Sequence, residues 1–165
     1  MNHKNIEIER KYKVLDDSFK RLATEHHHLR QGYLSLNDRN SIRVRIADDE
    51  AFLTVKSAPQ SNGFAHFEWE RPLSVEEAEN LFPLVVSGCI DKVRWIVPME
   101  DGLICEVDEF LGDNQGLLMA EVELESEDQL FVKPAFLGEE VTFNRHYYNS
   151  YLSLHPYTTW PLSDK

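Results

Sequence analysis

The stretch Glu7-Ile8-Glu9-Arg10-Lys11 places two carboxylates and an ammonium group at every second position near the start of the chain. On an extended strand, residues i, i+2 and i+4 share one face, so Glu7, Glu9 and Lys11 point to the same side. Such a face does not belong to a hydrophobic core, because burying unpaired charge is costly. It faces solvent or lines a polar cavity that binds a charged ligand, and recurrence of the pattern decides between the two.

The length of 165 residues and the hydrophobic content of 42% predict one domain, spanning 1–165, with enough apolar material for a core. Pro156 is expected to end the last helix, which leaves 156–165 as a loose tail. The chain has no long apolar run, and its polar start at 1–4 does not resemble a secretory signal. We therefore expect a cytoplasmic protein.

The formal net charge of −12 argues against two classes of partner. Nucleic acids and anionic membranes attract basic proteins, so we expect neither as a partner. A small phosphate ligand is different, because long-range repulsion is screened beyond roughly 8 Å at physiological ionic strength. A local cluster of basic side chains therefore suffices to hold it.

Short alternating stretches separated by turn signals predict a mostly antiparallel β protein. We expect strands at 6–14, 29–36, 41–47, 51–57, 66–72, 92–98, 103–110 and 118–125. Helices are expected at about 17–26, 74–86 and 145–154, the second opened by the capping box Ser74-Val75-Glu76-Glu77. Trp69 and Trp95 fall on outward faces, which assigns them to packing beneath helices or to a homodimer contact.

The charges on these strands are sorted by sign. Basic faces carry Arg43 with Arg45 and Lys92 with Arg94, and acidic faces carry Glu68 with Glu70, Glu106 with Asp108, and Glu121 with Glu123. For any single strand, one solvent-washed face is the ordinary explanation, but a solubility surface intersperses the two signs. The sorted strands therefore indicate a cavity with a cationic and an anionic wall. We predict an α+β fold, mostly β: a closed eight-stranded antiparallel β-barrel with peripheral helices and room for one small ligand.

The two walls predict the chemistry of the ligand. Arginine forks and lysine ammonium groups bind phosphate oxygens. Clustered carboxylates would repel a phosphate unless hard cations lay between them, and oxygen-only ligands select Mg²⁺ or Mn²⁺. Phosphates on one wall and carboxylate-held metal ions on the other are typical of phosphoryl or nucleotidyl transfer.

Ordered motifs along the chain resemble the CYTH domain, or triphosphate tunnel metalloenzyme, superfamily, and in particular its bacterial single-domain members. The N-terminal stretch matches the Glu-x-Glu-x-Lys signature of that superfamily. It is followed in order by Leu29-Arg30-Gln31-Gly32-Tyr33-Leu34, Arg43-Val44-Arg45, Leu53-Thr54-Val55-Lys56, Phe67-Glu68-Trp69-Glu70, Lys92-Val93-Arg94, Glu106-Val107-Asp108-Glu109, Ala120-Glu121-Val122-Glu123-Leu124-Glu125 and Tyr147-Tyr148-Asn149-Ser150. The likeness covers nearly the whole chain.

The resemblance implies an eight-stranded tunnel that binds a triphosphate compound together with two Mg²⁺ or Mn²⁺ ions. The implied substrate-binding residues are Lys11, Arg30, Arg43, Arg45, Lys56, Lys92 and Arg94. The implied metal ligands are Glu7, Glu9, Glu121 and Glu123. The supporting acidic lining would bind metal or hold the basic side chains in place, and consists of Glu68, Glu70, Glu106 and Asp108. The implied catalytic residues are Glu7, Glu9, Lys11 and Lys92, with Glu7 or Glu9 nearest the attacking water.

We therefore expect an enzyme that hydrolyses inorganic triphosphate, or a small organic triphosphate, to the diphosphate and phosphate. A cavity specified almost wholly by charge favours the smallest ligand that fills it with phosphate. Three alternatives remain: a class IV-type adenylate cyclase that converts ATP to cyclic AMP and pyrophosphate, a thiamine triphosphatase, and a non-catalytic polyphosphate- or nucleotide-binding module. The module would keep the basic wall and lose the metal carboxylates.

The run His26-His27-His28 falls at the end of the first expected helix. We expect it to be solvated or to interact with the helix dipole, and not to form a metal site, because hard cations prefer oxygen ligands. His28 also stands where many members of the superfamily carry another basic residue, two positions before Arg30. Tyr147, Tyr148 and Tyr151 are assigned to a helix packed on the barrel.

Overall fold

The computed structural model describes residues 6–58 and 65–165. Within these residues the strands are β1 (Ile6–Val14), β2 (Glu25–Leu36), β3 (Asn40–Ala47), β4 (Glu50–Ser57), β5 (Ala65–Leu73), β6 (Ile90–Pro98), β7 (Ile104–Phe110), β8 (Leu118–Glu123) and β9 (Leu137–Glu140). The helices are α1 (Phe19–Leu22), α2 (Val75–Leu81) and α3 (Asn149–Leu152), with short 3₁₀ helices beside them. The first eight strands lie where the alternating pattern predicts, whereas the four residues of β9 carry no such pattern.

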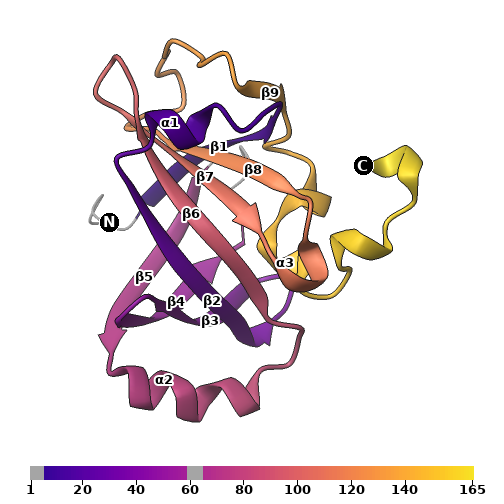
Figure 1. Cartoon of the computed structure of the whole chain (residues 1–165). Helices are drawn as coiled ribbons and strands as arrows, with labels where there is room; N and C mark the ends of the chain where they lie inside the picture. The colour runs from indigo at the N-terminus through magenta and orange to yellow at the C-terminus, as the bar shows by residue number, and fades with distance from the viewer. Residues whose placement is uncertain (1–5, 59–64) are drawn as a thin grey trace.

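Strands β1 to β8 form a closed antiparallel barrel, which confirms the predicted fold (Figure 1). Neighbours around the wall run β5-β4-β3-β2-β6-β7-β8-β1, and pairing of β1 with β5 closes the ring. β1 pairs with two neighbouring strands: residues 6–8 pair with β5, and residues 9–13 pair with β8. The charged stretch that opens the sequence therefore lies at the seam where the barrel closes.

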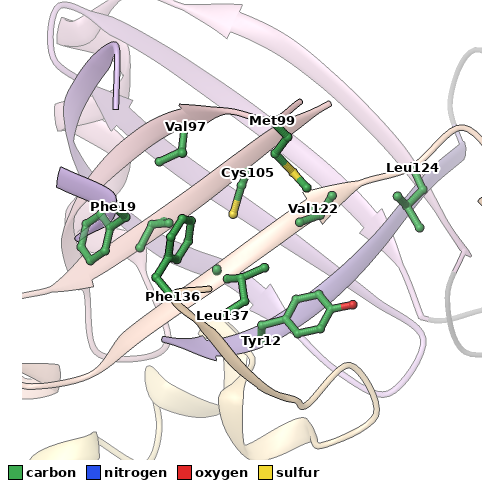
Figure 2. Packing of buried hydrophobic residues seen from close by; sticks show 11 residues of the cluster. Tyr12, Phe19, Val97, Met99, Cys105, Val122, Leu124, Phe136 and Leu137 are labelled. Carbon is green, nitrogen blue, oxygen red and sulfur yellow. The ribbon is translucent and has the colours of Figure 1, made fainter. Parts of the chain in front are cut away.

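One apolar core lies outside the barrel wall. On β7, Cys105 and Val107 are fully buried on the outer face, and the alternation of the strand turns Glu106 and Asp108 to the inside. Figure 2 shows Val97 and Cys105 of the wall facing Phe19, Phe136 and Leu137 of the covering segments. The hydrophobic effect thus holds α1 and β9 against the barrel and leaves the interior to polar groups.

A second apolar cluster fixes α2 across one end of β2, β3 and β4, as Figure 1 shows. Ser74 and Glu77 form the predicted capping box, in which the Glu77 N–H donates to Ser74 Oγ at 3.2 Å. Ala78 of the helix packs against Val44 and Ala51 of the wall. Gly32 permits the close approach of the segment that follows α2, because a Cβ there would lie only 2.6 Å from Cγ1 of Val85.

The C-terminal segment closes part of the interior with a third cluster. Tyr147 and Leu152 pack against Ile90, Phe110 and Met119, whose strands otherwise turn charged residues to the inside. The following 3₁₀ helices, Tyr157–Thr159 and Leu162–Asp164, extend this segment, and Tyr157 and Trp160 pack on the same cluster. None of the helices in the described residues has the length and apolar composition needed to cross a membrane.

The predicted helix at 17–26 is wrong beyond its first half. Only α1 is helical, and the histidine run belongs to β2. Tertiary contacts override the local signal, because the His26 ring stacks on Trp95 at 4.8 Å and His27 Nδ1 lies 2.8 Å from Asp48 Oδ2. His28 Nε2 lies 2.6 Å from Asp91 Oδ1, so strand contacts hold all three histidines, and none of them lies at a helix end.

The predicted helix at 145–154 is also interrupted. It divides into the 3₁₀ helix Arg145–Tyr147 and α3, because Tyr148 between them is extended, with φ −80° and ψ 141°. That break points the ring of Tyr148 at the barrel interior, where it lines the cavity described below.

We predict that Phe19→Ala destabilises the protein by about 3–5 kcal/mol. Phe19 is fully buried and meets the rings of Trp95 and Phe136 at 6.1 Å each, so its removal leaves a cavity. The measurement is the free energy of unfolding in urea. Leu22→Ala is the matched control, because Leu22 lies on the same helix but is 56% exposed. A loss at Phe19 no larger than that at Leu22 would contradict this packing.

Candidate active site

The barrel encloses a cavity of about 590 Å³. Its charged lining comes mainly from the inward face of seven strands and includes most of the residues that the sequence predicts: Glu7, Glu9, Lys11, Arg43, Arg45, Lys56, Glu68, Arg94, Glu106, Glu121 and Glu123. Because each of these residues lies on the charged face of its strand, the two-residue period of the sequence places them all inside.

Four predicted site residues do not line this cavity. Arg30 lies outside the barrel, because Gln31 and Tyr33 of the same strand are the inward residues; its guanidinium pairs with Glu79 of α2 and lies 4.2 Å from the ring centre of Phe82. The structure therefore does not bring Arg30 to the cavity, contrary to what the resemblance implies.

The other three residues are inside the barrel but do not line the cavity. Lys92 and Asp108 are only 1% exposed and lie beneath Arg94. Glu70 lies beside the two arginines of β3.

Opposite charges face each other directly across three pairs of strands. The register opposes Lys11 to Glu121, Lys56 to Glu68, and Arg94 to Asp108. Sorting the charges by strand is therefore what allows neighbouring strands to neutralise each other. Two other positions oppose like charges, Glu9 to Glu123 and Glu106 to Glu121. An excess of negative charge consequently gathers where β1, β8 and β7 meet.

Two lysines lie between carboxylates of this acidic region. Lys11 Nζ lies 2.9 Å from Glu9 and also bonds Glu121. Burial alone would lower the pKa of Lys11, but Glu121 and Glu9 outweigh it and raise the pKa above the usual range. Lys56 Nζ bonds Glu7 and lies 3.5 Å from Glu9. Both ammonium groups are thus charged and occupy positions between acidic side chains.

A buried network fixes Arg94. Asp108 accepts two hydrogen bonds from its guanidinium, at 2.7 and 2.8 Å, and Glu121 accepts a third at 3.0 Å. Burial would raise the pKa of Asp108, but Arg94 and Lys92 outweigh it and lower the pKa. Burial and the charge of Arg94 lower the pKa of Lys92 to about 8. Asp108 therefore holds the Arg94 fork from below the cavity, and Lys92 bonds Asp108 and keeps that carboxylate in place.

The arginine pair of β3 is less completely neutralised. Arg45 donates to Glu70 at 3.1 Å and Arg43 donates to Thr54 at 3.3 Å. The Nε atoms of both arginines are buried and have no hydrogen-bond partner within the described part of the chain. Burial, followed by repulsion from Arg43, lowers the pKa of Arg45 to about 10. The pair thus combines unused donors with excess positive charge, which is what an anionic ligand relieves.

The acidic side of the cavity has the donor chemistry of a hard-cation site. Partial burial, followed by repulsion from Glu7 and Glu106, raises the pKa of Glu123. Burial likewise raises the pKa of Glu68, with repulsion from Glu7 adding to it. Across residues 6–58 and 65–165, no three acidic, His or Cys side chains lie close enough to hold a metal as they stand, since lysines lie between them. Carboxylate oxygens that repel one another are nevertheless the donor set that a hard divalent cation prefers.

Several lining residues are not among the predicted ones. His66 shares the inward parity of Glu68, so alternation alone identifies its position. Tyr33 is inward because the register opposes it to Arg43, which the sequence of β2 does not signal. Arg145 and Tyr148 come from the irregular C-terminal segment, which has no period to read. The Tyr148 ring lies 5.3 Å from Lys11 Nζ, and its hydroxyl donates to the Thr142 carbonyl at 2.8 Å.

Comparison with known proteins points to one family. The model of the CYTH domain matches residues 5–156. An inorganic triphosphatase of Acetivibrio thermocellus is 41% identical over 152 residues, which cover 92% of this chain and 95% of that protein. An inorganic triphosphatase of Nitrosomonas europaea is 37% identical over 129 residues, covering 76% and 83%. A crystal structure of an inorganic triphosphatase superposes with a TM-score of 0.64 at 35% identity, covering 90% of this chain and 94% of the other.

We predict that Glu123→Gln raises the melting temperature of the metal-free protein at pH 7. The folded state holds the Glu123 proton more tightly than the unfolded state does, since its pKa is raised above 4.5. The wild type therefore loses stability as pH rises through that raised pKa, and the full penalty is present at pH 7. At about pH 4 the wild-type carboxyl is already protonated, and the difference should vanish.

Thermal unfolding in the presence of a chelator measures both points. Glu100→Gln is the control, because Glu100 is exposed in the turn before β7. A Glu123 variant that is less stable than the wild type at pH 7 would show that this carboxylate is not repelled by its neighbours.

Proposed function

The chain belongs to the CYTH domain family, and from that premise we propose that it hydrolyses inorganic triphosphate inside the barrel, with a divalent metal ion, to pyrophosphate and orthophosphate. The observation that carries the proposal is the arginine pair of β3, which has unused buried donors and a lowered pKa at Arg45. A chain of phosphate oxygens accepts those hydrogen bonds and neutralises that charge at once.

The preference for inorganic triphosphate rests on the lining of the cavity. Both walls are specified mainly by charged groups, so binding energy comes from phosphates more than from an organic part. Two relatives that cover most of the chain are named inorganic triphosphatases, which agrees with that preference.

The basic residues of the cavity hold the substrate. Arg43 and Arg45 grip phosphate oxygens from β3, and Arg94 does so from β6, where Asp108 keeps its fork in place. Lys11 and Lys56 lie between carboxylates in the free protein. When substrate binds, the two ammonium groups turn from these carboxylates to phosphate oxygens. Each lysine thus keeps a negative partner, and the carboxylates become free. Lys92 contributes by positioning Arg94 and not by touching the substrate.

The freed carboxylates are the residues that would hold the metal: Glu7, Glu9, Glu121 and Glu123. Two Mg²⁺ or Mn²⁺ ions bound there would neutralise the phosphate chain and lower the pKa of the attacking water. Glu7 or Glu9 lies nearest that water and accepts its proton at a carboxylate oxygen. The basic residues would hold the phosphate chain in place for attack, so that positioning and charge neutralisation supply most of the rate.

The alternatives differ from this proposal in their products. An adenylate cyclase would use the same phosphate grip and would release pyrophosphate and cyclic AMP from ATP. A thiamine triphosphatase would greatly prefer that substrate to inorganic triphosphate. A non-catalytic binding module has no use for the opposed carboxylates Glu9 and Glu123, whose repulsion is unfavourable without a cation.

We predict that Glu9→Gln lowers kcat with inorganic triphosphate by at least about a hundredfold, because it removes a charge from the metal side. Steady-state assays with Mg²⁺ and with Mn²⁺ measure the loss, and circular dichroism checks that the fold is kept. Glu100→Gln again serves as an exposed control with full activity. Undiminished turnover of Glu9→Gln would contradict the proposed role.

We predict that Arg45→Ala weakens triphosphate binding by roughly 10- to 100-fold, because it removes a charge-assisted contact. Isothermal titration calorimetry without metal separates binding from turnover. Arg30→Ala is the matched control, since Arg30 is an arginine on the outer face of the barrel. Equal losses for the two variants, or a loss at Arg30 alone, would overturn this assignment of the substrate contacts.

A further inference from the structure

Gln31 is a fully buried glutamine whose side chain makes no hydrogen bond. It is 0% exposed, and in the described residues neither its Oε1 nor its Nε2 atom has a partner. Native proteins satisfy most buried polar side-chain atoms, so an amide with both atoms unused calls for an explanation. The sequence gives no such signal, because a glutamine on an inward face ordinarily pairs with a neighbour.

The neighbours of Gln31 explain which partner is missing. It is opposed by Arg45 of β3 on one side and by Ile90 of β6 on the other. Directly opposed residues have Cβ atoms about 4.5–5.5 Å apart, so the carboxamide and the guanidinium are within reach of each other. Arg45 Nε, like Gln31 Oε1, is buried and unpaired. An unused acceptor thus lies beside an unused donor.

The two groups do not meet in the free protein because Arg45 is held elsewhere. Its Nη2 donates to Glu70 at 3.1 Å, and its guanidinium lies 5.6 Å from the ring centre of Phe52. Glu70 also accepts a hydrogen bond from Thr54 at 2.7 Å, so it keeps a partner when Arg45 leaves. A phosphate oxygen in the cavity competes with Glu70 for the same Nη atoms.

We propose that Gln31 is a positioning residue of the triphosphate site, whose Oε1 accepts a hydrogen bond from Arg45 Nε when the guanidinium turns from Glu70 to the substrate. This inference rests on the proposed function. The unsatisfied amide makes the free state less favourable, and binding relieves that cost, so Gln31 adds to affinity without touching the ligand. A neutral amide suits this role, because a carboxylate there would pair with Arg45 in the free protein and hold it back.

The test uses Gln31→Met, which keeps the length of the side chain and removes its hydrogen bonds. The free variant should melt at or above the wild-type temperature, since no hydrogen bond is lost. Its affinity for inorganic triphosphate, measured by calorimetry in metal-free buffer, should fall by about tenfold. With metal, KM should rise while kcat at saturation stays close to that of the wild type.

Asn114→Leu is the matched control. Asn114 is also a buried amide, but its Oδ1 already accepts a hydrogen bond from the Tyr157 N–H at 2.8 Å, far from the cavity. That variant should melt lower and bind triphosphate as the wild type does. Gln31→Glu provides a second substitution at the site, and should also bind more weakly because its carboxylate retains Arg45.

A double-mutant cycle identifies the partner. In an Arg45→Ala background, Gln31→Met should cause no further loss of affinity, because the residue acts only through Arg45. Wild-type affinity in Gln31→Met, or an equal loss with and without Arg45, would overturn the inference and leave the proposed function intact. Failure of the wild type itself to bind or cleave inorganic triphosphate in the presence of Mg²⁺ would overturn both.

Discussion

The structure depends on the pairing of opposite charges across the inside of a closed barrel. Lys11 opposes Glu121, and Arg94 opposes Asp108, in the strand register itself. Removing one member of such a pair leaves an uncompensated buried charge, which is strongly unfavourable. These pairs therefore tolerate an exchange of partners but not the loss of one member, and a ligand that carries both phosphate and divalent metal makes that exchange possible.

The apolar core follows from the same constraint. Since ion pairs occupy most of the interior, the strands turn apolar faces outward, where α1 and α2 cover them. The C-terminal segment packs instead on the inward residues Ile90, Phe110 and Met119 and closes part of the interior. The covering helices α1 and α2 are short, and each buries only part of the outer face of the wall. The two like-charge pairs, Glu9 with Glu123 and Glu106 with Glu121, mark the region where pairing within the chain is incomplete.

Alternation in the sequence predicts the eight barrel strands, and it predicts the inward faces of the seven strands whose inward positions carry charge. β2 is the exception, because Arg30 is the one charged residue of its segment 29–36 and nevertheless faces outward. The resemblance implies a place in the cavity for Arg30, whereas its partner Glu79 lies on a helix distant in sequence. The sequence predicts a helix end at the histidine run, because the residues that hold the run in a strand are distant from it in sequence: Trp95, Asp48 and Asp91. Arg145 and Tyr148 reach the cavity from a C-terminal segment without strands, so the two-residue alternation of the sequence does not predict their side-chain directions.

The central claim is that this charged interior holds and cleaves triphosphate. The most direct measurement is ³¹P NMR of the products after incubating the purified protein with Mg²⁺ and inorganic triphosphate, beside a parallel reaction with ATP. We expect one orthophosphate and one pyrophosphate for each inorganic triphosphate consumed, at a higher rate than any reaction of ATP. Cyclic AMP and pyrophosphate from ATP, or tight binding of triphosphate without turnover, would contradict it.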